Sequence, residues 1–203
     1  MNFKSELAPK GLQFNPADFV ISEKYANIGR KYGASVPFLR SKENSEDTSS
    51  SWDVVLEVLK KYKEKGMYFD TICLLQPTSP LRESKDILAG YELLKTKHAD
   101  SITSVCAVDH SPLWTMVLDK DLSLSEFRRH LKEVPRQQLD KYYRLNGAIY
   151  IKRIKYDKDI VLIDDNEYAV IMDYHNSVDI DTIEDFELAE WYINKLKNKG
   201  DKF

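Results

Sequence analysis

A short apolar run that breaks off in a proline-rich turn constrains this chain more than any other feature. Residues Thr71 to Arg82 read TICLLQPTSPLR. An apolar run of this length, bounded by turn residues, is typical of a strand buried on both faces of a sheet. Because proline cannot donate a ladder hydrogen bond, we expect the strand to stop near Gln76. Ligands of open α/β sheets bind beyond the carboxyl ends of such strands, so the candidate binding residues are Gln76, Thr78, Ser79 and Arg82. An ordinary strand-to-helix turn with serine and threonine caps is the alternative.

Helical and extended patterns alternate on both sides of this strand. Amphipathic spacing predicts helices after Ser22, from about Ser51 to Gly66, after Ser84 and after Thr182, the last with a buried stripe of Phe186, Ala189, Ile193 and Leu196. Further strands are expected at 101–108, 144–151 and 168–174. This order predicts an α/β fold with a mostly parallel sheet and flanking helices. The segment 110–143 follows no clear period, which favours a functional or interaction arm.

Length, charge and cysteine usage narrow the class of protein. The chain has 203 residues, which suits one domain over 1–203, and a net charge of −3, which gives no sign of nucleic acid binding. No apolar run approaches the ~20 residues that a membrane span needs. Both cysteines lie in apolar runs and read as buried free thiols of a reducing compartment. We therefore expect a cytoplasmic protein without membrane partners.

Two aspartates near the last predicted helix form a candidate metal site. Asp179 and Asp181 flank one residue, and side chains at i and i+2 of an extended strand point the same way. Repulsion between two converging carboxylates is relieved by a divalent cation that prefers hard oxygen ligands, and Mg²⁺ is the natural candidate. The alternative is that the two aspartates cap the helix at Thr182.

A second candidate set surrounds the predicted strand at 144–151. Arg136 lies in the irregular arm, and Arg144 and Asn146 lead directly into the strand. Two guanidinium groups and an amide suit an anionic substrate that carries a carboxylate. Solvated surface arginines beside a turn at Asn146-Gly147 are the alternative.

Five segments, in one order along the chain, resemble the motifs of the CMP-sialic acid synthetases, the N-acylneuraminate cytidylyltransferases. The similarity extends from about Glu23 to Glu190. The segments are Tyr32 to Arg40 (YGASVPFLR), Glu46 to Val55 (EDTSSSWDVV), Leu74 to Arg82 (LLQPTSPLR), Pro135 to Ile151 (PRQQ, then RLNGAIYI) and Ser177 to Glu190 (SVDIDT, then DF and AE). Each motif alone is moderately specific, whereas five in register are a strong signal.

The resemblance implies a nucleotide-diphospho-sugar transferase fold that transfers CMP from CTP to a nonulosonic acid, an acidic nine-carbon sugar, and releases pyrophosphate. It also implies a homodimer paired through the arm at 110–143. The implied roles are sugar contact for Gln76, nucleotide contact for Arg40 and Thr78, the acid-sugar site for Arg136, Arg144, Asn146 and Tyr150, Mg²⁺ binding for Asp179 and Asp181, and catalysis for both aspartates with Arg136.

One part of the family pattern has no counterpart here. The family opens with a strand and a glycine- and lysine-bearing loop, R-x-G-S-K-G followed by K-N, that holds the triphosphate; this chain shows at most a faint echo at Ala8 to Leu12. Two alternatives therefore stay open. The chain could be a catalytically silent sugar-binding or oligomerisation homologue, or an active enzyme for another sugar such as legionaminate or pseudaminate.

Overall fold

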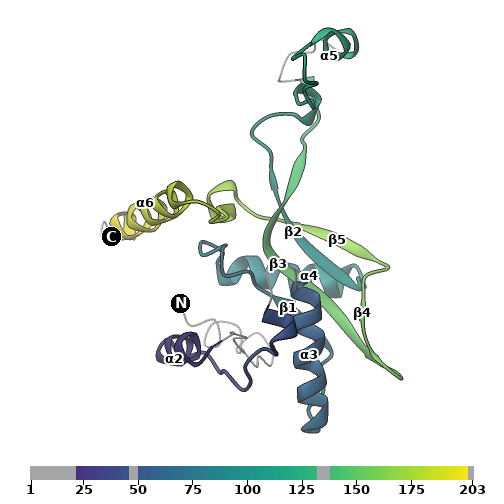
Figure 1. The fold of residues 1–203 in the computed structure, drawn as a ribbon, viewed down its shortest axis with the longest axis vertical. Coiled ribbons are helices and arrows are strands. Elements are labelled where there is room, and N and C mark those ends of the chain that lie inside the picture. The colour runs from purple at the N-terminus through teal and green to yellow at the C-terminus, as the bar shows by residue number, and fades with distance from the viewer. Residues whose placement is uncertain (1–21, 46–49, 132–137, 201–203) are drawn as a thin grey trace. The chain divides into compact units, whose positions relative to one another are not determined.

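The computed structural model describes residues 22–45, 50–131 and 138–200 (Figure 1). The chain forms two compact units, each assembled from three segments. Unit 1 comprises the described parts of 1–74, 83–102 and 149–168. Unit 2 comprises the described parts of 75–82, 103–148 and 169–203. The prediction of one domain stays a prediction. Within the described residues, no helix is long and apolar enough to span a membrane.

The strands are β1 (Thr71–Leu74), β2 (Ser101–Ala107), β3 (Tyr143–Tyr156), β4 (Ile160–Ile163) and β5 (Glu167–Ile171). Hydrogen bonds join them in the order β1-β3-β2-β5, and β4 pairs with β3 (Figure 1). Strand β1 ends at Leu74, close to the predicted end. Its four residues are only half-buried, not buried on both faces as expected.

The α/β class with flanking helices is confirmed, but the mostly parallel sheet needs correction because the sheet is mixed. Strand β3 runs antiparallel to both β1 and β4, with Leu74 opposite Tyr150 and Arg153 opposite Ile163. Strands β2 and β5 are parallel, because Asp100 bonds to Asn166 just before both strands begin, and Val105 bonds to Met172 near the end of both. Antiparallel neighbours need no crossover helix, and an arm replaces such a helix between β2 and β3.

The α-helices in the described part of unit 1 are α2 (Glu23–Lys31), α3 (Ser51–Glu64) and α4 (Ser84–Thr96). The Ser50 side chain accepts a hydrogen bond from the Trp52 amide and so caps α3 as expected. The buried face of α3 is the one that the apolar spacing predicts, namely Val54, Val55, Val58, Leu59 and Tyr62. Helix α4 is capped by Glu83 and Asp86 in a reciprocal box, and Ser84 is its first residue.

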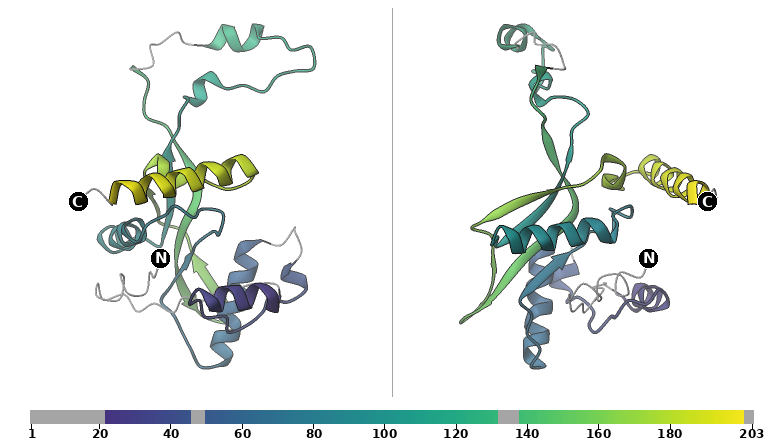
Figure 2. Two further views of the ribbon diagram at one scale, coloured as in Figure 1. Left: turned by 90° about the vertical axis from the view of Figure 1, so that its left-hand side faces the viewer. Right: turned by 180° about the vertical axis from the view of Figure 1, so that it is seen from behind.

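Unit 2 carries the arm and the last helix. The arm between β2 and β3 contains the 3-10 helix η3 (Pro112–Trp114) and the short helix α5 (Ser125–His130), and Figure 2 shows it as an extended loop. Helix α6 (Ile183–Gly200) follows the 3-10 helix η5 (Tyr174–Ser177). A small core joins Leu81, Val178 and Ala189, with Ile180 and Tyr192 packed against it.

The predicted buried stripe of α6 is largely wrong. Ala189 is buried, but Phe186 is 53% exposed and Ile193 is 36% exposed. The side chain of Leu196 lies outside the described residues. Periodic apolar spacing shows that a helix has an apolar face, but it does not show which part of that face a neighbouring element covers.

Candidate active site

The turn after β1 is held to strand β3 by an arginine. Arg82 Nη1 donates to the carbonyl oxygen of Gln76 at 2.7 Å and to that of Ala148 at 3.0 Å. A guanidinium that binds two main-chain carbonyls fixes the path of both segments. Arg82 therefore joins the QPTSP turn to the NGA segment of β3, where sequence reasoning had offered it to a ligand.

The same turn is joined to the aspartate segment by the main chain. The amide nitrogen of Ile180 donates to the carbonyl oxygen of Thr78 at 2.8 Å. Ile180 also packs against the small core of unit 2. Because side chains alternate along extended backbone, an inward Ile180 directs Asp179 and Asp181 away from that core. Three motifs that are far apart in the sequence thus meet within unit 2.

Asp179 holds a carboxylate oxygen that is buried without a partner. Its Oδ1 is buried and has no hydrogen bond within the described part of the chain. Gly147 has a φ of +73°, and a Cβ built on it would lie 3.5 Å from Asp179 Oδ2. Glycine is suited to this backbone conformation and lets this part of β3 come close to the carboxylate. An uncompensated buried oxygen is costly unless a ligand completes it.

The alternative that Asp179 and Asp181 cap the last helix is contradicted. Asp185 Oδ2 accepts hydrogen bonds from the Thr182 amide at 2.9 Å, the Thr182 hydroxyl at 2.9 Å and the Asp181 amide at 3.2 Å. The Thr182 hydroxyl accepts from the Asp185 amide in return. These bonds, the Thr182 hydroxyl first, hold the pKa of Asp185 below its ordinary value. The carboxylates of Asp179 and Asp181 are thus left for another role.

The two carboxylates of Asp179 and Asp181 fit a cation whose coordination shell is completed by a substrate. No group of three or more histidine, cysteine or acidic residues that could hold a metal occurs among the described residues. Mg²⁺, however, is commonly held by one or two carboxylates together with substrate phosphates. Asp179, with its unpartnered buried oxygen, and the exposed Asp181 form such a pair.

Asn146 is a buried structural residue at the start of β3. Asn146 is 1% exposed, so its side-chain amide oxygen and nitrogen are both buried. Asn146 Oδ1 accepts from the Ser104 hydroxyl at 2.6 Å and from the Ala148 amide at 3.3 Å. Its Nδ2 donates to the Ser177 hydroxyl at 2.8 Å and contacts Met172 Sδ at 3.4 Å.

The other predicted site residues lie as follows. In unit 2, Gln76 is half-buried, Thr78 is half-buried within the turn, and Arg144 is exposed, with Nη1 donating to the Leu145 carbonyl at 3.3 Å. In unit 1, Arg40 is exposed, and Tyr150 is half-buried with its ring 6.0 Å from that of Trp52. Arg136 lies outside the described residues.

Sequence reasoning missed the hydroxyls that hold Asn146. Ser104 lies in the middle of β2 and Ser177 at the end of η5, and both are buried. Ser177 is the first residue of the SVDIDT motif, so the motif could have pointed to it. The sequence gives no comparable sign of a role for Ser104, because a single serine within an apolar strand is ordinary.

The arrangement of strands and helices is shared with a solved nucleotide-sugar enzyme. The chain resembles CMP:2-keto-3-deoxy-manno-octonic acid synthetase complexed with CTP with a TM-score of 0.56 and 13% identity, over 87% of this chain and 79% of that one. The fold is therefore that of the nucleotide-sugar transferases.

Curated relatives narrow the class further. The CMP-N,N'-diacetyllegionaminic acid synthase of Legionella pneumophila is 32% identical over 177 residues, covering 83% of this chain and 73% of the relative. The N-acylneuraminate cytidylyltransferase of Escherichia coli is 32% identical, over 88% of this chain and 41% of its own length. The pseudaminic acid cytidylyltransferase of Campylobacter jejuni is 26% identical, over 83% of this chain and 73% of its own. No protein-family model matches the chain. The chain belongs to the CMP-sialic acid synthetase family of cytidylyltransferases, which confirms the resemblance carried by the five motifs.

Proposed function

We propose that this protein transfers CMP from CTP to a nonulosonic acid and releases pyrophosphate. The observation that carries the proposal is the hydrogen bond from the Ile180 amide to the Thr78 carbonyl, at 2.8 Å. It ties the QPTSP turn, at the carboxyl end of a strand, to the segment that bears both aspartates. Ligands of open α/β sheets bind at such strand ends.

Asp179 and Asp181 would be the residues that hold Mg²⁺. The Oδ1 of Asp179 is buried and unpartnered among the described residues, so a cation there would relieve a desolvated charge. When bound, the ion neutralises charge on the phosphate oxygens of CTP. Gln76 is proposed to hydrogen-bond the sugar, and Arg40 and Thr78 to contact the nucleotide. With both substrates held in line, the anomeric hydroxyl would attack the α-phosphate while the α–β phosphoanhydride bond breaks. Pyrophosphate would leave, and the hydroxyl proton would pass to solvent.

The arginines are proposed to recognise the sugar's carboxylate. Arg144 is exposed and donates only one weak bond to its neighbour's carbonyl in the described structure, so its remaining donors suit a carboxylate. Arg136 is proposed to bind the same carboxylate and to take part in catalysis. Tyr150 is proposed to contact the sugar. Asn146 is proposed to act on the sugar site indirectly, by holding β3 to Ser104 of β2 and to Ser177 near the aspartates.

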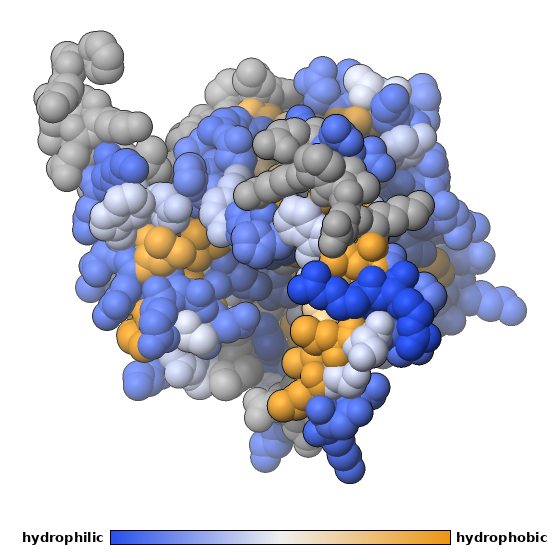
Figure 3. All heavy atoms as spheres, turned by 90° about the horizontal axis from the view of Figure 1, so that it is seen from above, coloured by the Kyte–Doolittle hydropathy of each residue, from blue (hydrophilic) through white to orange (hydrophobic). Residues whose placement is uncertain are grey.

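The arm at 110–143 is proposed to pair two copies of the chain. Apolar side chains along it are exposed, including Val117 at 95%, Leu122 at 69% and Leu118 at 52%. Figure 3 shows hydrophobic groups open to solvent on the face of the molecule drawn there. Exposed apolar side chains along one segment support a role in an interaction.

Pyrophosphate release tests the proposal directly. The purified protein is incubated with CTP, Mg²⁺ and, in turn, N-acetylneuraminate, a legionaminate and a pseudaminate; we expect release with at least one of them. Release with none, at high protein concentration, would contradict the proposed transfer. Asp181→Asn should abolish turnover and leave thermal unfolding unchanged, since Asp181 is exposed. Glu184→Gln, an exposed neighbour in α6, is the matched control.

A further inference from the structure

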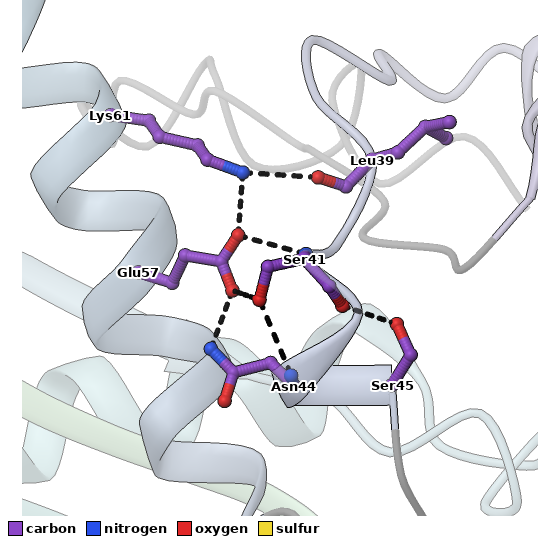
Figure 4. Close-up of polar contacts among 6 residues, drawn as sticks. All are labelled: Leu39, Ser41, Asn44, Ser45, Glu57 and Lys61. Carbon is purple, nitrogen blue, oxygen red and sulfur yellow. Dashed lines mark hydrogen bonds and ion pairs between the residues drawn. The ribbon is translucent and has the colours of Figure 1, made fainter.

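A glutamate in the middle of α3 is the centre of a polar cluster in unit 1. Glu57 Oε1 accepts from the Ser41 amide at 3.0 Å, and Oε2 accepts from the Ser41 hydroxyl at 3.0 Å and from Asn44 Nδ2 at 2.5 Å (Figure 4). Lys61, one turn further along α3, pairs with Glu57 Oε1 at 2.5 Å. Burial on its own would raise the pKa of Glu57, but these hydrogen bonds, Lys61 first, lower it to about 2.

The cluster binds both neighbours of Arg40. On one side, Lys61 Nζ donates to the Leu39 carbonyl at 3.1 Å; on the other, Ser41 gives both its amide and its hydroxyl to Glu57 (Figure 4). Ser41 is held further because its carbonyl accepts from the Ser45 hydroxyl at 2.6 Å. The peptide on either side of Arg40 is thus fixed to α3, while the side chain of Arg40 is exposed.

We propose that Glu57 is a positioning residue for nucleotide binding, because it holds Ser41 directly and holds Leu39 through its ion pair with Lys61, and so presents the guanidinium of Arg40 to the anionic groups of CTP. The inference rests on the proposed function, which assigns Arg40 to the nucleotide. An ionised carboxylate accepting several hydrogen bonds is a strong local anchor. Holding a long cationic side chain at its root lowers the conformational entropy lost when it binds a phosphate.

A purely structural link between α3 and its preceding loop predicts a different outcome. In that case removal of the carboxylate would loosen the loop and lower stability, but the loss in CTP affinity would not depend on Arg40. Positioning predicts a loss that requires Arg40. A double-mutant cycle separates the two.

The first experiment measures CTP binding by calorimetry with Mg²⁺ present. Glu57→Gln should weaken CTP binding by roughly tenfold to a hundredfold, the range expected from misplacing a binding group by about 1 Å. In the Arg40→Ala background the same substitution should change CTP affinity less than twofold. Glu64→Gln, which removes an equal charge from an exposed position of α3, should bind CTP as the unmodified protein does. Equal losses from Glu57→Gln with and without Arg40 would overturn the proposal.

Steady-state kinetics and proteolysis complete the test. Glu57→Gln should raise KM for CTP with little change in kcat or in KM for the sugar, and Ser41→Ala, a milder variant, should do the same to a smaller extent. Trypsin cleavage after Arg40 should become severalfold faster in both variants than in Glu64→Gln. If the unmodified protein binds no CTP, the proposed function fails, whereas unchanged cleavage after Arg40 in Glu57→Gln refutes the positioning itself.

Discussion

Replacement of Asn146 by alanine distinguishes a structural role for this residue from direct contact with substrate. The substitution removes an acceptor for the Ser104 hydroxyl and the Ala148 amide and a donor to the Ser177 hydroxyl, at 2.6, 3.3 and 2.8 Å. Ser177 keeps a second bond, to the Asp173 carbonyl at 2.8 Å, so its hydroxyl is not orphaned.

The magnitude follows from these contacts. Each lost hydrogen bond is worth about 1 kcal/mol net, and a buried group that loses its only partner costs about 1–3 kcal/mol. Three lost bonds therefore predict a loss of about 3 kcal/mol in the free energy of unfolding. In a chain of 203 residues this lowers Tm by roughly 6–12 °C.

Urea denaturation followed by circular dichroism measures the change, and sugar binding by calorimetry complements it. Ser177→Ala, which removes one of the bonds, should cost about 1 kcal/mol. If Asn146→Ala leaves the free energy of unfolding within 0.5 kcal/mol, roughly the effect of a surface substitution, and abolishes sugar binding, then Asn146 contacts the sugar directly and our reasoning is wrong.

Three further predictions concern other contacts. Hydrogen bonds lower the folded pKa of Glu57 from 4.5 to about 2, so the stabilisation by its carboxylate is present above pH 4.5 and is lost as pH falls toward 2. The difference in the free energy of unfolding between the protein and Glu57→Gln is at most about 3 kcal/mol. Acid titrations of unfolding should show this difference shrinking between pH 4.5 and about 2. Gly147→Ala should destabilise by about 1–2 kcal/mol, since φ is +73°, with a Cβ 3.5 Å from Asp179 Oδ2; unchanged urea midpoints would contradict this strain. Val117→Asp, at a side chain 95% exposed, should convert a dimer to monomers in sedimentation velocity and leave Tm unchanged; an intact dimer would exclude this part of the arm from the interface.

Much of the fold could be predicted from sequence because apolar spacing reports directly on burial. The face of α3 from Val54 to Tyr62 was read correctly, as was the end of β1 near Gln76. The direction of β3 could not be read, since an apolar run looks the same whichever way its neighbours point. The exposed Phe186 of α6 shows a related limit, because spacing identifies an apolar face but not its cover.

The site was predicted unevenly for a similar reason. Residue type and order were sufficient to single out Asp179 and Asp181, whose free carboxylates agree with a binding role. Asn146 was also singled out, but an amide suits a ligand and a buried network equally well. Glu57 gave no signal at all, since a glutamate four residues before a lysine on a helix reads as a solvated ion pair.

The bond between Ile180 and Thr78 has an evolutionary consequence, because both of its atoms belong to the peptide chain. Ordinary point substitutions at either position keep an amide hydrogen and a carbonyl oxygen, so the bond itself does not depend on either side chain. Only proline at position 180 removes the donor. The bond is thus protected from most mutations, while the side chain of Ile180 stays constrained by the core that it packs against.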